Sequence, residues 1–332
     1  MRPIAAFALL AAGLVALPAQ ALPSWFYPRA TVCNGFAQNC QKLFSNFTFI
    51  GTHDSYAIGR YSLAANQDTS VTAQLNAGIR MLQSQAHKST NSTPTGAGID
   101  LCHTDCGLFQ GGSLEYYLAQ VKAWVDKNPT EVISLLIVNS DNLPASQFAK
   151  AFESTGLASK SYRSPKPTTG TAKSAWPTLG KLIEAGTPVV NFLASKADNS
   201  VPYLIDEFTS MWENPYDQLT VPFSCSVDRI ASGYNPANLM YLSNHFKDTT
   251  FLGIKGISIP DKKAMPTTNS AAQVLADANN CASMHGSWPT FVLVDFFNTP
   301  MKNGPLTAAA QMNRTPWTSN TSAIPPSSIS GA

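Results

Sequence analysis

Two histidines and two aspartates stand where side chains could carry out acid–base chemistry. His53 and Asp54 lie just past the apolar run 47–50, and His103 lies just past the run 99–102. A strand fixes the direction of the side chain at its end, and two imidazoles held together can act as base and acid on one substrate. We therefore expect His53 and His103 to form the centre of an acid–base site, with Asp54 beside them.

Asp295 and His245 are further candidates at predicted strand ends. Asp295 closes the apolar run 291–294, where a charge needs a partner, and a histidine would suit because a carboxylate fixes its tautomer. The alternative is a structural aspartate that caps a turn. His245 ends the run 240–244 and is kept as a pocket residue, although a lone histidine is more often structural.

Short apolar runs and amphipathic stretches alternate along the chain. The runs that predict strands are 47–51, 78–85, 99–102, 132–139, 188–193, 240–244 and 291–296, with an eighth expected near 256–259. Helices are expected over 114–127, 147–154, 179–185, 201–208 and 271–279. This alternation predicts an α/β fold with a parallel barrel, in which catalytic groups gather at the carboxyl ends of the strands.

The first residues are typical of a secretory signal peptide. A short basic start is followed by the apolar run 4–18 and by Ala19-Gln20-Ala21, so we expect residues 1–21 to be removed, a retained anchor being the alternative. Residues 22–314 are expected to form one domain. The tail 315–332, rich in Ser, Thr and Pro, is expected to be disordered, and the protein to be secreted.

Six cysteines suit an oxidising compartment. The most economical pairing is Cys33 with Cys40, Cys102 with Cys106, and Cys225 with Cys281. The alternative at Cys102 and Cys106 is a metal site, but zinc would need two more ligands nearby. Asparagines that begin glycosylation sequons are Asn46, Asn91, Asn313 and Asn320.

A formal net charge of +2 and a charged fraction of 13% argue against a nucleic-acid binder, which would need clustered Lys and Arg. The chain lacks a Gly-rich phosphate loop, a nucleophile elbow and a His-Glu-x-x-His motif. We expect a monomer without a cofactor. The aromatic cluster Trp25-Phe26-Tyr27 could allow transient membrane contact, although no basic segment accompanies it.

Several motifs taken in order resemble the phosphatidylinositol-specific phospholipase C X domain. They are Gly51-Thr52-His53-Asp54-Ser55, Gly78-Ile79-Arg80, Leu101-Cys102-His103 and Asn128-Pro129-Thr130-Glu131-Val132-Ile133. Similar segments at 189–190, 203–208, 244–246 and 292–296 extend the likeness through most of residues 30–300. The chain is most similar to the secreted fungal branch, the phospholipase C-like phosphodiesterases.

The resemblance implies a distorted TIM (β/α)8 barrel that cleaves a phosphodiester without a covalent enzyme intermediate. By position, His53 would be the general base, His103 the general acid, and Asp295 the residue that orients His53. Asp54 would support the two histidines without contacting the substrate. The expected substrate-binding residues are Gln83, Gln85, Asn139 and His245, and no metal ligand is expected.

Gln83 and Gln85 depart from the family pattern. Relatives carry an Asp and an Arg, or acidic metal ligands, at these positions. Neutral amides make a poor calcium site, and loss of one charge-stabilising donor can lower turnover by about 10²–10³-fold. We therefore expect a metal-independent hydrolase of a phosphoinositide-like phospholipid or related phosphodiester. The alternatives are a barrel that binds phosphorylated head groups without efficient turnover, and a metal-dependent phosphohydrolase built on His53-Asp54.

Overall fold

The computed structural model describes residues 29–59, 62–91, 96–251 and 258–316. The expected signal peptide, the aromatic cluster 25–27 and the tail beyond residue 316 lie outside these ranges. Within them, each helix is too short or too polar to cross a bilayer.

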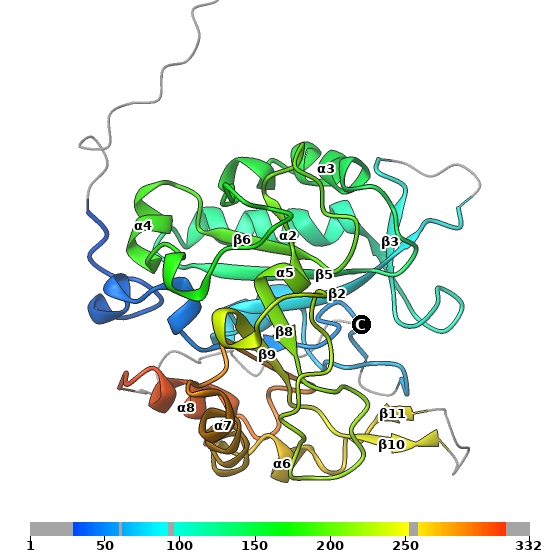
Figure 1. Ribbon diagram of the computed structural model, residues 1–332. Coiled ribbons are helices and arrows are strands. Elements are labelled where there is room, and N and C mark those ends of the chain that lie inside the picture. Colours follow the sequence, from blue (N-terminus) through cyan, green and yellow to red (C-terminus); the bar gives the residue numbers. More distant parts are fainter. Residues whose placement is uncertain (1–28, 60–61, 92–95, 252–257, 317–332) are drawn as a thin grey trace, which may run out of the picture.

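Eight parallel strands form the centre of the fold (Figure 1). Across the sheet their order is β7, β6, β5, β2, β1, β12, β9 and β8, and every neighbouring pair is parallel. Their bounds are β1 Phe49–Thr52, β2 Met81–Lys88, β5 Ile133–Asn139, β6 Val189–Leu193, β7 Leu204–Asp206, β8 Met211–Glu213, β9 Met240–Asn244 and β12 Phe291–Val294. In the described chain β7 and β8 do not pair with each other, so the barrel is not fully closed. The predicted distorted TIM-type fold is confirmed.

One predicted element was wrong, and the sequence missed two barrel strands, β7 and β8. Segment 201–208, expected as a helix, forms β7 and then enters the one-turn helix α5 (Glu207–Ser210). Asp206 caps this helix by accepting a hydrogen bond from Thr209 N. Strands β7 and β8 have three residues each, which is too short to show a period.

Segment 99–102 is a strand, β3 (Ile99–Cys102), but it lies outside the barrel. It pairs antiparallel with the far end of β2 and with β4 (Gln110–Ser113). The strand expected near 256–259 falls partly outside the described residues. Its described part belongs to β11 (Ser258–Pro260), which forms a separate antiparallel pair with β10 (Asp248–Thr250).

Helices cover the outside of the barrel on two sides (Figure 1). They are α1 Val71–Ala77, α2 Leu114–Lys127, α3 Ala145–Ser154, α4 Leu179–Glu184, α6 Met265–Thr268, α7 Ala271–His285 and α8 Pro305–Met312. Short 3-10 helices occur at Ala37–Gln41, Phe44–Asn46, Leu157–Lys160, Lys173–Ala175 and Pro236–Asn238. Helix α2 begins where the Ser113 side chain accepts a hydrogen bond from Tyr116 N, and it buries one apolar stripe against the sheet.

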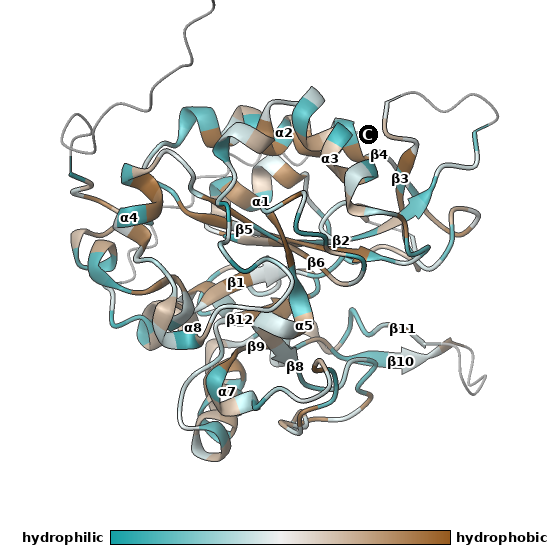
Figure 2. Cartoon of the chain, turned by 45° about the horizontal axis from the view of Figure 1, so that its top comes forward, coloured by the Kyte–Doolittle hydropathy of each residue, from teal (hydrophilic) through white to brown (hydrophobic). Residues whose placement is uncertain are grey.

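The strands separate two apolar layers, one inside the barrel and one between the sheet and the outer helices. Figure 2 shows central strands such as β5 and β6 in the brown of hydrophobic residues. In β12, Phe291 and Leu293 face the barrel interior, whereas Val292 and Val294 pack under the outer helices. Phe44 and Trp176, with ring centroids 5.2 Å apart, help to fill the interior. Gly51 leaves room for this packing, because a Cβ there would lie 2.6 Å from Met81 Sδ. The apolar filling leaves the carboxyl ends of the strands for polar groups.

All three predicted disulfides are confirmed. Cys33 bonds to Cys40, Cys102 to Cys106, and Cys225 to Cys281. The metal alternative for Cys102 and Cys106 was therefore wrong.

Candidate active site

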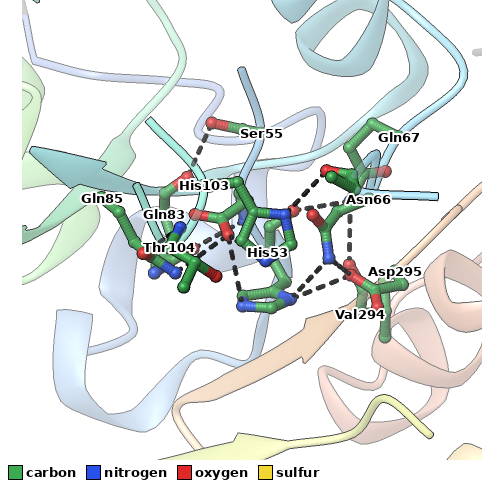
Figure 3. A network of polar contacts seen from close by, with 12 residues as sticks. His53, Ser55, Asn66, Gln67, Gln83, Gln85, His103, Thr104, Val294 and Asp295 are labelled. Atoms are coloured by element: carbon green, nitrogen blue, oxygen red, sulfur yellow. Dashed lines mark hydrogen bonds and ion pairs between the residues drawn. The ribbon is translucent and has the colours of Figure 1, made fainter. Parts of the chain in front are cut away.

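The parallel pairing of β1 with β12 brings His53 next to Asp295. The register aligns Thr52 with Val294, and His53 N donates a hydrogen bond to Val294 O at 3.0 Å. Each side chain then follows its strand on the face that points into the barrel. His53 Nδ1 lies 3.0 Å from Asp295 Oδ1 (Figure 3).

Two amide side chains from the segment after β1 hold this pair in place. Asn66 Nδ2 donates to Asp295 Oδ1 at 3.0 Å, and Gln67 Nε2 donates to the carbonyl oxygens of His53 and Val294 at 2.9 and 3.1 Å. Because the Asp295 carboxylate is an acceptor, the proton of a neutral His53 resides on Nδ1. Nε2 is then the nitrogen available to a substrate.

The electrostatic surroundings of His53 favour its protonated form. Burial lowers the pKa of His53, but the charges of Asp295, Asp54 and Asp248 and the hydrogen bond to Asp295 outweigh it and raise the pKa to about 9. One face of the imidazole is covered by the Phe246 ring, with centroids 4.1 Å apart and planes within 3°. These charges therefore favour the imidazolium, and His53 can act as a base only in its neutral fraction.

Asp54 lies beneath both histidines and is fully buried. Its Oδ2 is 3.7 Å from His53 Nε2 and 3.6 Å from His103 Nε2. Its backbone N donates to Gln83 Oε1 at 2.6 Å, which fixes the turn that the residue makes in the left-handed region, with φ of 38°. Burial raises the pKa of Asp54, while the two histidines act in the opposite direction.

His103 reaches the same place from the loop after β3. Its Nδ1 donates to Ala64 O at 2.7 Å, so Nε2 is directed at Asp54. The rings of His53 and His103 are 6.4 Å apart between centroids and nearly perpendicular, at 80°. Their side chains are 16% and 17% exposed, so solvent reaches both. The structure thus brings His53, His103, Asp54 and Asp295 together. Figure 3 shows the two histidines and Asp295 in this cluster.

Gln83 and Gln85 belong to the same cluster but already have protein partners. Gln85 Nε2 donates to Asp54 Oδ2 at 3.1 Å, and its Oε1 accepts from Thr104 N at 3.2 Å. Gln83 is buried under Asp54. Gln85 ties the segment that carries His103 to strand β2, whereas Gln83 ties β2 to the turn that carries Asp54.

Asn139 and His245 do not join the cluster. Asn139 Nδ2 donates to the carbonyl oxygens of Leu143 and Ser195, and its Oδ1 accepts from Leu143 N, so the side chain closes its own loop. His245 is buried outside the barrel, with Nε2 2.8 Å from Thr268 O and Nδ1 3.5 Å from Asp277 Oδ2. Neither has a free polar group to offer a substrate, and we do not retain them as substrate-binding residues.

Sequence reasoning missed Asn66, Gln67, Phe246 and Asp248. Strand alternation was a signal for Phe246, because Met240, Leu242 and Asn244 face inward and residue 246 continues that face where His245 does not. Asp248 begins β10, and burial together with nearby Asp295 raises its pKa to about 7. Asn66 and Gln67 stand in an irregular segment that has no periodic signal.

A second polar group lies inside the barrel near β8. The Arg229 guanidinium contacts Glu213 Oε2, which also accepts from Asn244 Nδ2 at 3.1 Å. Burial and the neighbouring Glu213 raise the pKa of Glu207 well above its ordinary value. The charge of Arg229 is therefore directed at these carboxyl groups.

Within the described residues, no group of three or more His, Cys, Asp or Glu side chains is placed to hold a metal ion. The cluster around His53 instead offers two imidazole nitrogens and amide groups.

Comparison with known proteins identifies relatives along nearly the whole chain. A family model described as PI-PLC X 1 matches residues 39–313. A protein of Arthroderma benhamiae named PI-PLC X domain-containing protein 1 is 38% identical over 289 residues, which cover 85% of this chain and 90% of that protein. A second protein of the same fungus, described as an uncharacterized secreted protein, is 36% identical; the match covers 85% of this chain and 64% of that protein.

Two bacterial proteins of known structure share the fold. The phosphatidylinositol-specific phospholipase C of Listeria monocytogenes aligns with a TM-score of 0.54 at 16% identity, covering 84% of this chain and 96% of that one. A variant of the phosphatidylinositol-specific phospholipase C of Staphylococcus aureus aligns with a TM-score of 0.55 at 13% identity, covering 87% and 99%. At these identities the likeness supports the barrel fold.

Proposed function

The chain belongs to the PI-PLC X domain family, and we propose that it is a phosphoric diester hydrolase that uses His53 and His103 as its acid–base pair. The observation that carries this proposal is the convergence of both Nε2 atoms on Asp54, at 3.7 and 3.6 Å, at the carboxyl ends of parallel strands. Packing alone does not account for two partly exposed imidazoles directed at one point. The proposal is further supported by their position at the carboxyl ends of the strands, where barrel enzymes carry their catalytic residues.

In this proposal one histidine is the general base and the other is the general acid. His53 Nε2 accepts the proton of the hydroxyl that attacks phosphorus, and Asp295 stabilises the imidazolium that forms. His103 Nε2 donates a proton to the leaving oxygen, and its contact with Ala64 O keeps the ring oriented. Each acid or base typically contributes about 10²–10⁴-fold to rate.

The proposed substrate is a phospholipid with a phosphoinositide-like head group or a related small phosphodiester. The bacterial proteins that share the fold are described as phosphatidylinositol-specific. We further propose that the protein acts without a metal, as a secreted monomer that touches membranes transiently. Secretion is supported by the pattern of residues 1–21, the three disulfides and the description of one relative as secreted.

The raised pKa of His53 favours a second candidate function. An imidazolium that persists at neutral pH can hold a phosphate oxygen as a fixed positive charge, and the amides of Gln83 and Gln85 contribute none. The alternative is therefore a barrel that binds phosphorylated head groups with little turnover. It predicts saturable binding of inositol phosphate to a protein that does not hydrolyse the corresponding diester.

Turnover of a soluble chromogenic inositol phosphodiester tests the proposal. We expect His53→Ala and His103→Ala each to lower kcat by about 10²–10⁴-fold. His285→Gln is the matched control, because His285 lies at the end of α7 and contacts Cys225 O, so it should retain turnover. Undiminished turnover in both active-site variants would rule out the mechanism, and binding without turnover by the native protein would support the alternative.

A further inference from the structure

The loop that carries His103 is closed by a small disulfide ring. Cys102 is the last residue of β3, and its bond to Cys106 encloses His103, Thr104 and Asp105. Cys102 is fully buried, so the ring is anchored in the sheet at one end. The direction of the His103 side chain is thereby tied to the end of a strand, although the residue itself belongs to a loop.

The ring holds a backbone conformation that this sequence would not readily adopt by itself. Thr104 has a φ of 65°, in the left-handed region that β-branched residues strongly disfavour. Such a conformation persists when the surroundings over-determine it. Here the disulfide is joined by hydrogen bonds from Thr104 N to Gln85 Oε1 and from Asp105 N to His103 O.

The three disulfides differ in their exposure. Cys33, Cys40, Cys225 and Cys281 are at most 3% exposed, whereas Cys106 is partly exposed on the surface loop. Thiol–disulfide exchange requires a thiolate to reach one sulfur of the bond. A small thiol can therefore attack Cys106 Sγ and release the Cys102 thiolate, which takes up a proton. A second thiol then frees Cys106 and leaves as part of the oxidised small disulfide.

We propose that the Cys102–Cys106 disulfide is a positioning element for His103, and that its selective reduction by a small thiol lowers turnover while the barrel stays folded. This inference rests on the proposed function, because it assigns the ring a role through His103. Reduction frees Thr104 to leave the left-handed region. The imidazole then moves away from Ala64 O and Asp54, and a displacement of about 1 Å can cost on the order of 10²-fold in rate.

Graded treatment with dithiothreitol, followed by alkylation and peptide mass spectrometry, tests the inference. We expect Cys102 and Cys106 to be labelled first, kcat for the soluble phosphodiester to fall by about 10–100-fold, and KM and the thermal midpoint to change little. Reoxidation should restore turnover. The double variant Cys102→Ala/Cys106→Ala is the control; it should start at the low kcat and show no response to dithiothreitol.

The outcomes separate this inference from the proposed function. Full turnover with Cys102 and Cys106 labelled, or labelling of Cys33 or Cys225 before Cys106, would overturn the inference and leave the hydrolase intact. An untreated native protein without turnover would overturn both. A fall in kcat that coincides with loss of the thermal transition would show that the ring supports the fold as a whole, which also contradicts the proposal.

Discussion

Replacing Asp295 by asparagine removes one negative charge from beside His53 while keeping the size of the side chain. Asp295 is fully buried, and its Oδ1 receives hydrogen bonds from Asn66 and His53. An asparagine oxygen can still accept, so the main change is electrostatic. The pKa of His53, raised from 6.5 to about 9, corresponds to about 3 kcal/mol in favour of the charged imidazole.

Of the charges that raise the pKa of His53, that of Asp295 has the largest effect, and those of Asp54 and Asp248 have smaller ones. We therefore expect Asp295→Asn to lower the pKa of His53 by roughly one to two pH units. Burial lowers this pKa, and the variant has one fewer negative charge to raise it again. A group whose pKa is raised on folding contributes stability that is complete below its unfolded pKa of 6.5 and is lost as pH rises through about 9. The variant should thus lose more stability at pH 6 than at pH 10.

Two measurements check this expectation. NMR titration of the His53 ring should show the lower pKa directly, and urea unfolding at pH 6 and pH 10 should show a deficit of about 1–3 kcal/mol that shrinks at the higher pH. The acid limb of kcat/KM should move to lower pH while its maximum falls. Asp277→Asn is the matched control, since Asp277 is buried beside His245 away from the site. An unchanged His53 titration, or a deficit independent of pH, would refute the reasoning.

Four further predictions concern the rest of the site and the fold. Gln85→Glu should lower turnover by about 10–100-fold, because it replaces the donor to Asp54 Oδ2 by a second carboxylate; the same kcat as the native protein would contradict this. A chelator should leave turnover unchanged, and loss of activity that added calcium restores would contradict the metal-independent mechanism. Asn313→Ala should cost about 2 kcal/mol in urea unfolding, because the buried Asn313 amide bonds to both N and O of Thr48. For the same reason peptide mapping should find no glycan on Asn313, whereas Asn46 is exposed and open to modification.

The sequence alone indicated the acid–base candidates because strand ends leave a local signature. An apolar run followed by a polar residue identifies a side chain at the edge of a buried sheet, as at His53 and Asp295. The short sequence separations of Cys33 from Cys40 and of Cys102 from Cys106 likewise favoured pairings that the structure confirms. These features depend on neighbours along the chain.

The tertiary structure decided which of those candidates meet. Asn139 and His245 also end strands, but each points away from the barrel interior, a direction set by pairing register that a short run does not display. Asn66 and Gln67 reach the site from an irregular segment whose course depends on distant partners such as Val294. Strands β7 and β8 are stabilised by their neighbours β6 and β9, and their three residues carry no period of their own. The sequence by itself determined the family, the disulfides and the acid–base residue types, while packing among distant segments determined the geometry, because hydrogen bonds and charges act between atoms that only the fold brings together.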